Sequence, residues 1–100
     1  VWHDGFRKEL KKMIRFKWLD NGTVRESTWG GNTIEALQAA VEYLGAEYDQ
    51  ADGAWTYRAP ETGEVVLVDE DDLMAAGAAI LSGAKDWYTI WCAETGAPAR

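Results

Sequence analysis

Few side chains in this 100-residue sequence could carry out covalent or acid–base chemistry. The single histidine, His3, stands beside the N-terminus, whereas nucleophilic catalysis needs a base held next to the nucleophile. The single cysteine, Cys92, lies among aromatic residues, which is typical of a small buried side chain rather than a reactive thiol. Ser27 and Ser82 lack the context of a nucleophile elbow. The sequence therefore predicts a protein that is not an enzyme.

Two acidic segments, residues 69–72 and 49–53, are the candidates for a metal site. A calcium loop alternates its oxygen ligands and closes with a late glutamate, and neither segment has that pattern. A helix start explains the first segment and a hairpin turn explains the second. One cysteine excludes a multi-cysteine zinc site, and Gly30-Gly31 lacks the lysine of a phosphate loop. We therefore expect no metal and no cofactor.

Charge is divided unevenly along the chain, whose net charge is −7. Residues 1–25 hold seven bases and three acids, whereas residues 26–100 hold three bases and fourteen acids. The acidic excess argues against direct nucleic-acid binding, which needs a basic face for the phosphates. Two interpretations stay open: the acids are a solvated face and the two ends attract each other, or the acids present a negative surface to a basic protein partner.

The second interpretation points to acids that no local structural role explains. Asp69 is expected to cap a helix and Asp52 to form a turn, so neither is a good candidate. Hairpin edges and an outward-facing first helical turn can present charge without an internal partner. The candidate partner-binding residues are therefore Glu47, Asp49, Glu61, Glu64, Glu70, Asp71 and Asp72.

The first hairpin is predicted from Asn21-Gly22, which separates two segments of alternating polarity. A two-residue loop pairs Lys17 with Glu26 and Leu19 with Val24. Opposite charges and apolar side chains then meet across the strands, which stabilises a hairpin. Ahead of it, the helical spacing of residues 2, 6, 10 and 13 predicts a short helix. Residues 1–12 are alternatively an N-terminal extension.

Two main helices are predicted, over residues 34–44 and Glu70–Ser82. The first is capped by Asn32 and ended by Gly45. Its inward residues are expected to be Ile34, Leu37, Val41 and Leu44. The second begins with acids that suit the positive end of the helix dipole. Its inward residues are expected to be Leu73, Gly77, Ile80 and Leu81.

The remaining segments are interpreted as strands. Asp52-Gly53 predicts a second two-residue hairpin, with Tyr48 opposite Tyr57 and Glu47 opposite Arg58. Residues 60–63 predict a third turn. Residues 65–68 are all apolar, so both faces of a strand there would be apolar. This pattern predicts a central strand covered on both faces. Residues 87–92 are ambiguous, but their aromatic and β-branched content favours a strand, and residues 94–100 are expected to be a loose tail.

These elements predict one α+β domain over residues 1–100, in the order (α)ββαβββαβ. The expected architecture has two layers, a mostly antiparallel sheet of five to six strands with the two main helices packed on it. Of the six tryptophans, about four are expected in the core, and an exposed aromatic cluster is the alternative role. No apolar segment is long enough to predict a membrane span, and none resembles a signal peptide. The single cysteine fits a reducing cytoplasm.

Residues 55–80 combine a strand pair with an acidic helix start and an alanine-rich helix around Gly77. This quarter of the chain resembles the C-terminal part of phage proteins associated with tail-fibre assembly. The whole chain, short, acidic and without catalytic groups, resembles small phage-encoded inhibitors such as anti-CRISPR proteins. These resemblances imply a mobile-element protein that acts in a bacterial cytoplasm, and they assign no functional residue.

We therefore expect a non-enzymatic acidic protein that inhibits a host macromolecule by occluding a basic surface, for example one that normally holds nucleic acid. It is expected to be a monomer or a small homo-oligomer, without direct contact with nucleic acid or membrane. The alternative is a phage assembly or virion accessory protein that oligomerises through exposed aromatic residues.

Overall fold

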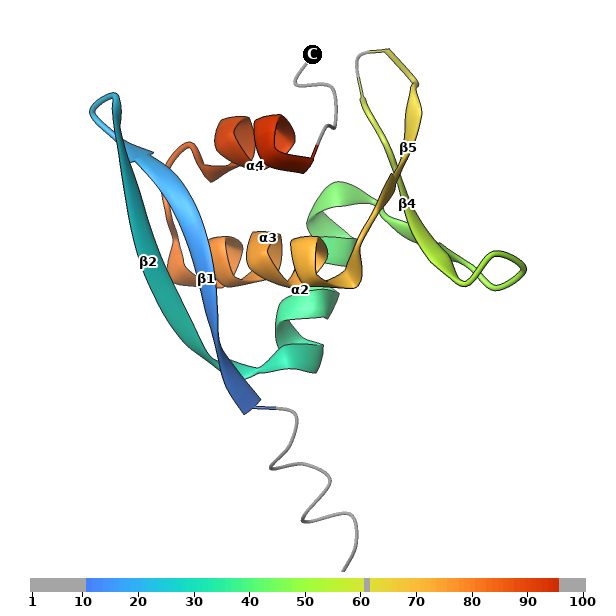
Figure 1. Ribbon diagram of the computed structural model, residues 1–100, viewed down its shortest axis with the longest axis horizontal. Helices are drawn as coiled ribbons and strands as arrows, with labels where there is room; N and C mark the ends of the chain where they lie inside the picture. The colour runs from blue at the N-terminus through green and yellow to red at the C-terminus, as the bar shows by residue number, and fades with distance from the viewer. Residues whose placement is uncertain (1–10, 61, 96–100) are drawn as a thin grey trace, which may run out of the picture.

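The computed structural model describes residues 11–60 and 62–95, which form two antiparallel sheets and three helices (Figure 1). The first sheet is a long hairpin of β1 (Lys11–Asp20) and β2 (Thr23–Asn32). The second contains β3 (Glu47–Asp49), β4 (Ala54–Arg58) and β5 (Val65–Val68). The helices are α2 (Thr33–Leu44), α3 (Glu70–Ser82) and α4 (Trp87–Thr95). The α+β class is confirmed.

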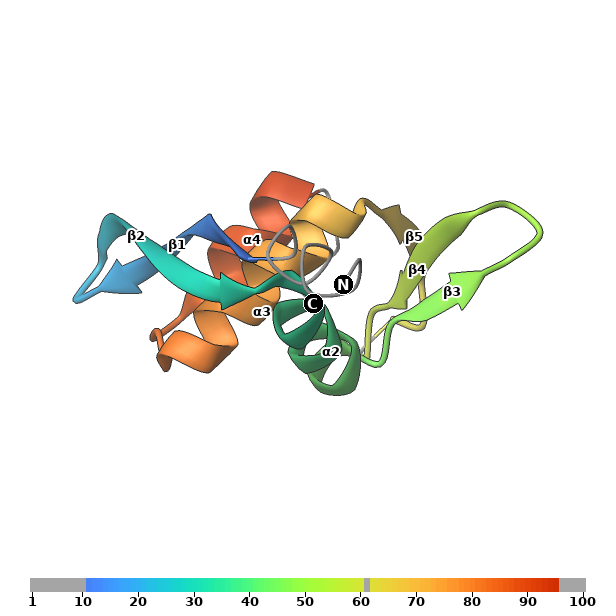
Figure 2. The same cartoon turned by 90° about the horizontal axis from the view of Figure 1, so that it is seen from below.

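The single sheet of five to six strands is not found. Seen from below, the hairpin and the three-stranded sheet lie at opposite ends of the molecule, with the helices between them (Figure 2). α3 contacts the hairpin, α2 and α4, so the helices occupy the space in which the strands of the two sheets would otherwise meet. Each sheet buries one face toward this helical layer, which contains the fully buried side chains of Leu73 and Cys92.

The first hairpin has the predicted register. Lys17 lies opposite Glu26 and Leu19 opposite Val24. Asn21 and Gly22 both have positive φ, 51° and 84°, as a primed two-residue turn requires. The hairpin turns Ile14 and Phe16 into the core, and β1 begins at Lys11. The prediction that the N-terminal helix extends to Met13 is therefore wrong, because residues 11–13 belong to a strand. The rest of that predicted helix, residues 1–10, lies outside the described residues.

Both main helices are confirmed, but their inward faces differ from the expected ones. The Asn32 side chain accepts a hydrogen bond from the Ile34 backbone N–H (2.8 Å), and Gly45 ends α2 at a φ of 70°. The buried residues of α2 are Ala36, Ala40 and Leu44, whereas Ile34 is 44% exposed. In α3, Leu73 and Gly77 are buried as predicted, with Ala76, Ala78 and Ala79, but Ile80 is half-buried and Leu81 is exposed.

The inward faces differ from the expected ones because α2 and α3 approach each other closely. A Cβ atom placed on Gly77 would lie 1.7 Å from the carbonyl oxygen of Ala36. Backbones that approach so closely accept only small residues between them. The alanine side of α2 therefore faces α3, and Leu37 and Val41 are left half-buried at its flank.

The predicted register of the second hairpin is wrong. Tyr48 pairs with Trp55 and Glu47 with Thr56, so the loop contains four residues, 50–53. Asp49 holds this loop, because its side chain accepts a hydrogen bond from the Ala51 backbone N–H (2.9 Å) and its carbonyl accepts one from Gly53 (2.7 Å). Because Asp49 takes the first position of the turn, the loop begins at residue 50 and not at the predicted residue 52.

Strand β5 is an edge strand and not the predicted central one. It pairs with β4 alone, Val68 is buried, and Leu67 is 69% exposed. The predicted third turn is confirmed, since the Ala59 N–H bonds the Glu64 carbonyl (2.8 Å) and Gly63 has a φ of 75°.

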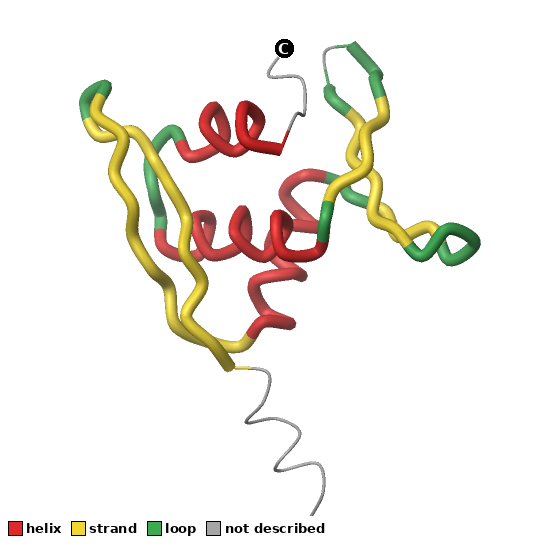
Figure 3. Tube along the Cα trace, viewed as in Figure 1, coloured by secondary structure: helices red, strands yellow, loops and turns green. Residues whose placement is uncertain are grey.

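Residues 87–92 belong to a helix and not to the predicted strand (Figure 3). Trp87 and Trp91, four residues apart, lie on one side of α4 and are both buried with Cys92. The indole of Trp91 donates to the Asp72 carbonyl (2.8 Å), so α4 is held against α3. The spacing of apolar residues in so short a segment does not distinguish a helix from a strand. Here tertiary contacts selected the helix.

The C-terminal end of the described chain and the tryptophans also differ from the expectations. Glu94 and Thr95 close α4 instead of beginning a loose tail, and residues 96–100 lie outside the described residues. Two of the five described tryptophans are buried and the other three are half-buried, fewer in the core than expected. Across residues 11–60 and 62–95, no helix has both the length and the apolar composition needed to cross a membrane.

Candidate functional site

The candidate acids lie mostly on the side of the molecule that carries the three-stranded sheet (Figure 1). Glu47 and Asp49 are on β3, and Glu64 immediately precedes β5. Residues 70–72 form the first turn of α3, where successive side chains point in different directions around the helix axis. Glu61 lies outside the described residues.

Two of these acids have roles inside the fold. The Asp49 carboxylate accepts hydrogen bonds from the backbone N–H groups of Ala51 and Asp52, so it organises the β3–β4 turn. Asp72 is half-buried, and this burial, followed by the charge of Asp69, raises the pKa of its carboxyl group. Asp69 occupies the predicted N-cap position, although its side chain makes no capping hydrogen bond.

The remaining four described candidates, Glu47, Glu64, Glu70 and Asp71, are exposed, and we call them the acidic surface. Within the described part of the chain, none of their carboxylates takes part in a hydrogen bond or an ion pair. The two ion pairs there use bases of the hairpin, Lys17 with Glu94 (2.8 Å) and Arg25 with Asp20 (2.7 Å).

The fold turns the charge division of the sequence into a division in space. Residues 11–32, the hairpin, contain five bases and two acids, and residues 47–72 contain nine acids and one base, Arg58. The guanidinium of Arg58 donates to the carbonyl of Gly63 (2.9 Å), which places it at the turn between β4 and β5. Among the described residues, Arg58 lies beside the acidic surface but forms no ion pair with its carboxylates.

A pocket walled by tyrosines is the feature that the sequence did not predict. It has a volume of about 350 Å³ and lies between α2, β4 and α4, lined by Tyr43, Leu44, Tyr57, Arg58, Pro60 and Tyr88. The hydroxyl groups of Tyr57 and Tyr88 are hydrogen-bonded to each other. Burial and this hydrogen bond raise the pKa of Tyr88 above the ordinary tyrosine value. The pocket offers flat apolar walls and phenol hydroxyls.

The sequence contains a signal for this pocket, but it is visible only with a helical period and not with the predicted strand period. On a strand, Tyr88 and Trp87 would point to opposite faces. On α4, Trp87 contacts Tyr43 (ring centroids 5.5 Å apart) while Tyr88 stacks on Trp91 (6.3 Å). A helical assignment of residues 87–95 would have brought these rings together.

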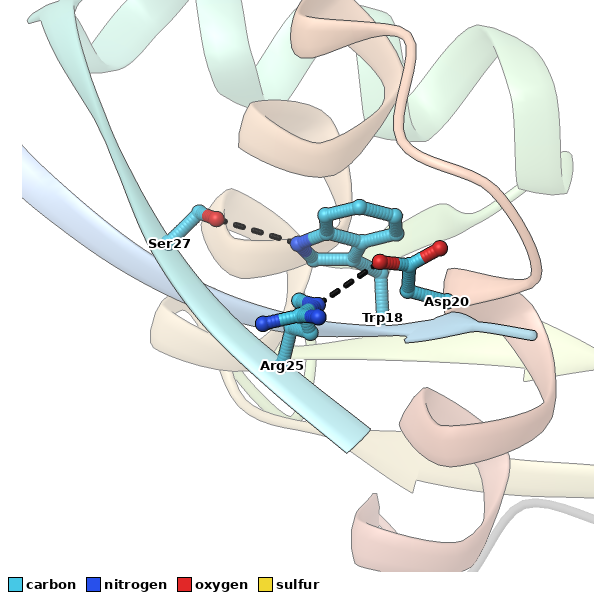
Figure 4. Close-up of polar contacts among 4 residues, drawn as sticks. All are labelled: Trp18, Asp20, Arg25 and Ser27. Carbon is cyan, nitrogen blue, oxygen red and sulfur yellow. Dashed lines mark hydrogen bonds and ion pairs between the residues drawn. The ribbon is translucent and has the colours of Figure 1, made fainter. Parts of the chain in front are cut away.

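A second cavity, of about 400 Å³, lies between the hairpin and the loop that joins α3 to α4. Figure 4 shows its polar contacts: the Trp18 indole donates to the Ser27 hydroxyl (3.0 Å), and Arg25 pairs with Asp20. The Ser27 oxygen therefore accepts from an indole and faces no base that could activate it. These contacts stiffen the end of the hairpin.

The described residues contain no cluster of side chains suited to metal binding. No three His, Cys, Asp or Glu side chains of residues 11–60 and 62–95 are placed to hold a metal ion. Cys92 is buried, as predicted, and His3 lies outside the described residues. That the protein has no catalytic site and no cofactor stays a prediction.

Neither a protein-family model, nor a curated protein, nor a solved structure matches the chain. The likeness to phage proteins therefore remains a hypothesis based on residue patterns. Function has to be inferred from the geometry and charge of the chain itself.

Proposed function

We propose that the protein is a non-enzymatic binding protein that inhibits a host macromolecule by covering a basic surface. The observation that carries this proposal is the acidic surface, whose four carboxylates are exposed and unpaired within the described residues. Carboxylates without an internal partner keep their capacity to pair with Lys and Arg of another protein. Their summed charge also steers a basic partner toward this side of the molecule.

The outer face of the three-stranded sheet supports the same proposal. Leu67, Thr56 and Glu47 lie opposite one another in the strand register, so their side chains share this face. Leu67 and Val65 are exposed there, and Glu47 stands at the rim. An apolar centre with a charged rim is the usual anatomy of a protein interface.

The proposed partner is a bacterial protein whose basic surface normally holds nucleic acid. Occlusion of such a surface needs no catalytic group, in keeping with the small set of reactive side chains in the sequence. It is also the mode of action that the resemblance to small phage inhibitors implies, for a protein in the host cytoplasm.

The test begins with affinity capture of a partner from bacterial lysate, followed by measurement of its association rate with purified protein. We expect this rate to fall as salt rises, because steering between exposed charges is screened. The double variant Glu70→Gln with Asp71→Asn should slow association about tenfold while the dissociation rate changes less.

The matched control is Glu35→Gln with Glu42→Gln, which removes the same charge from exposed positions of α2. It should slow association less than about twofold, because these residues lie outside the acidic surface. Equal effects of the two double variants, or an association rate insensitive to salt, would sink the proposal.

One observation favours the alternative, an assembly protein that oligomerises through exposed aromatic residues. Tyr43 and Tyr48 are 63% and 51% exposed. The five described tryptophans, in contrast, are all buried or half-buried. Light scattering of Tyr43→Ser would show a lower mass than wild type if this alternative holds. An unchanged mass would exclude Tyr43 from any assembly contact.

A further inference from the structure

The two edges of the β1–β2 hairpin differ in how they are covered. The edge of β1 faces the helices: the Leu19 N–H bonds the Lys85 carbonyl (3.2 Å), and Lys17 pairs with Glu94 on α4 (2.8 Å). Figure 1 shows β2 on the side of the hairpin that is turned away from α3 and α4. The two-residue turn sets the alternation, so every second residue of β2 directs its N–H and C=O away from β1.

These outward backbone groups belong to Val24, Glu26, Thr28 and Gly30. Among the described residues, none of them has a hydrogen-bond partner on the side away from β1. All four residues are exposed, and Val24 is 58% exposed. The β1 edge is thus joined to the helical layer at Leu19 and Lys17, whereas the β2 edge is open within the described residues.

The open edge has only one of the features that usually protect an edge strand, the charged side chains of Arg25 and Glu26. Natural proteins also blunt such edges with proline, a β-bulge, lysine or a short strand. β2 has ten residues, contains no proline or lysine, and pairs one-to-one with β1 along its whole length. It is therefore a ready template for the addition of another strand.

We propose that a second copy of this chain adds its own β2 to this edge, antiparallel, about a twofold axis at Ser27. The argument for a second copy is that β2 complements itself in this register. Glu26 then lies opposite Thr28 of the second copy, and Arg25 lies opposite Trp29 of the second copy. The latter pair brings a guanidinium to an indole on the same face.

The other symmetric registers are worse. An axis at Arg25 or at Glu26 sets that residue against its own copy, and like charges directly opposite each other destabilise a sheet. An axis at Thr28 leaves Glu26 and Arg25 opposite glycines, Gly30 and Gly31. The Thr28 axis pairs as much of the strand as the Ser27 axis, but only the Ser27 axis sets Thr28 opposite Glu26 and Trp29 opposite Arg25.

Such a dimer closes on itself. Pairing uses the β2 edges of both copies in one four-stranded sheet. Because a twofold contact uses the same edge of each copy, it stops at two copies and does not grow into a filament.

The test is the mass of the full chain across a concentration series, by sedimentation velocity or light scattering. We expect a reversible dimer, and slower hydrogen exchange at the amides of Val24, Glu26 and Thr28 as concentration rises. A monomer at every concentration, with fast exchange at these amides, would overturn the proposal.

Two matched substitutions at one position identify the register. Thr28→Glu places a carboxylate opposite Glu26 at two symmetric points and should raise the dimer dissociation constant at least about tenfold. Thr28→Lys faces Glu26 and should preserve or tighten the dimer. Within one monomer Thr28 lies opposite Arg15. Thr28→Glu should therefore stabilise the hairpin and Thr28→Lys should destabilise it, the reverse of their effects on the dimer. Loss of the Thr28→Glu dimer therefore cannot be a folding defect.

A charge exchange completes the test. Glu26→Lys combined with Thr28→Glu again sets opposite charges across the axis and should restore the dimer lost in Thr28→Glu alone. Equal weakening by Thr28→Glu and Thr28→Lys, or a dimer indifferent to both, would refute pairing about Ser27.

Discussion

At the scale of single residues, similar side chains have different roles because their surroundings differ. Asp49 and Glu47 stand two positions apart on β3, yet Asp49 organises a turn, whereas the carboxylate of Glu47 has no polar partner among the described residues. In the first turn of α3, Glu70 is exposed whereas Asp72 is half-buried. Spacing in the sequence nominates such acids, but burial and hydrogen bonding separate them.

Asp72 carries a prediction on pH dependence. Its pKa in the folded protein is raised, first by burial and then by the charge of Asp69, so the fold binds this proton more tightly than the unfolded chain does. The contribution of Asp72 therefore lowers stability as pH rises through and above the ordinary aspartate pKa of about 4. Asp72→Asn should stabilise the protein at pH 7, by less than about 1 kcal/mol because the carboxyl keeps part of its solvent contact.

Urea unfolding at pH 7 and again near pH 3 measures this difference. The gain should vanish near pH 3, where the carboxyl of Asp72 is protonated in both states. Glu70→Gln is the control, because this exposed acid at the start of the helix should lose a small favourable interaction with the dipole. A stabilisation of Asp72→Asn that is the same at both values of pH would contradict the assigned cause.

At the scale of elements, helix packing is decided by the smallest residues. α2 and α3 approach so closely that Gly77 faces the backbone of Ala36. The larger apolar residues Leu37 and Val41 are consequently only half-buried. A hydrophobic stripe read from the sequence favours the larger residues, whereas the observed contact uses glycine and alanine.

Gly77→Ala tests this contact. Although alanine favours a helix more than glycine does, its Cβ would lie 1.7 Å from the Ala36 carbonyl oxygen. The two helices must separate, and we expect a loss of about 3 kcal/mol in the free energy of unfolding, measured by urea denaturation.

Ser82→Ala, at an exposed position of the same helix, is the matched control and should change stability by less than about 0.5 kcal/mol. If Gly77→Ala proved neutral or stabilising, the close crossing of α2 and α3 would be incorrect.

At the scale of the whole molecule, Tyr57 is the largest fully buried side chain between the three-stranded sheet and the helices. Tyr57 is only 2% exposed, contacts the Trp91 ring edge-on (centroids 5.7 Å apart) and bonds the Tyr88 hydroxyl. The adjacent pocket lies at the same junction. The acidic surface depends on this junction because part of it is carried by the sheet.

Tyr57→Ala should cost about 4 kcal/mol, because it opens a large cavity between β4 and α4. Tyr57→Phe keeps the ring and loses the hydrogen bond, so we expect about 1 kcal/mol. Thermal unfolding and amide exchange of β3, β4 and β5 measure both effects. Thr56→Ala, on the outer face of β4, loses only the hydrogen bond from the Thr56 hydroxyl to the Glu47 carbonyl (3.3 Å) and should cost less than about 1 kcal/mol; a cost equal to that of Tyr57→Ala would show that the faces of β4 are assigned wrongly.

The elements predicted correctly from the sequence are those specified by local chemistry. Asn21-Gly22 specified the first hairpin, because only a primed two-residue turn sets both the twist and the charge pairing of its strands. Asn32 and Gly45 bounded α2 for the same kind of reason, since a cap satisfies backbone groups within a few residues. The acids of the candidate site were nominated by charge alone.

Tertiary structure decided what local patterns leave open. Residues 87–95 are compatible with either period, and contacts of Trp91 with Asp72 and of Tyr88 with Tyr57 selected the helix. The split into two sheets, the inward face of α2 and the tyrosine pocket all follow from the packing of α2, α3 and α4 between the strands. Contacts between residues far apart in the chain set these features, and such contacts leave no fixed spacing in a single sequence.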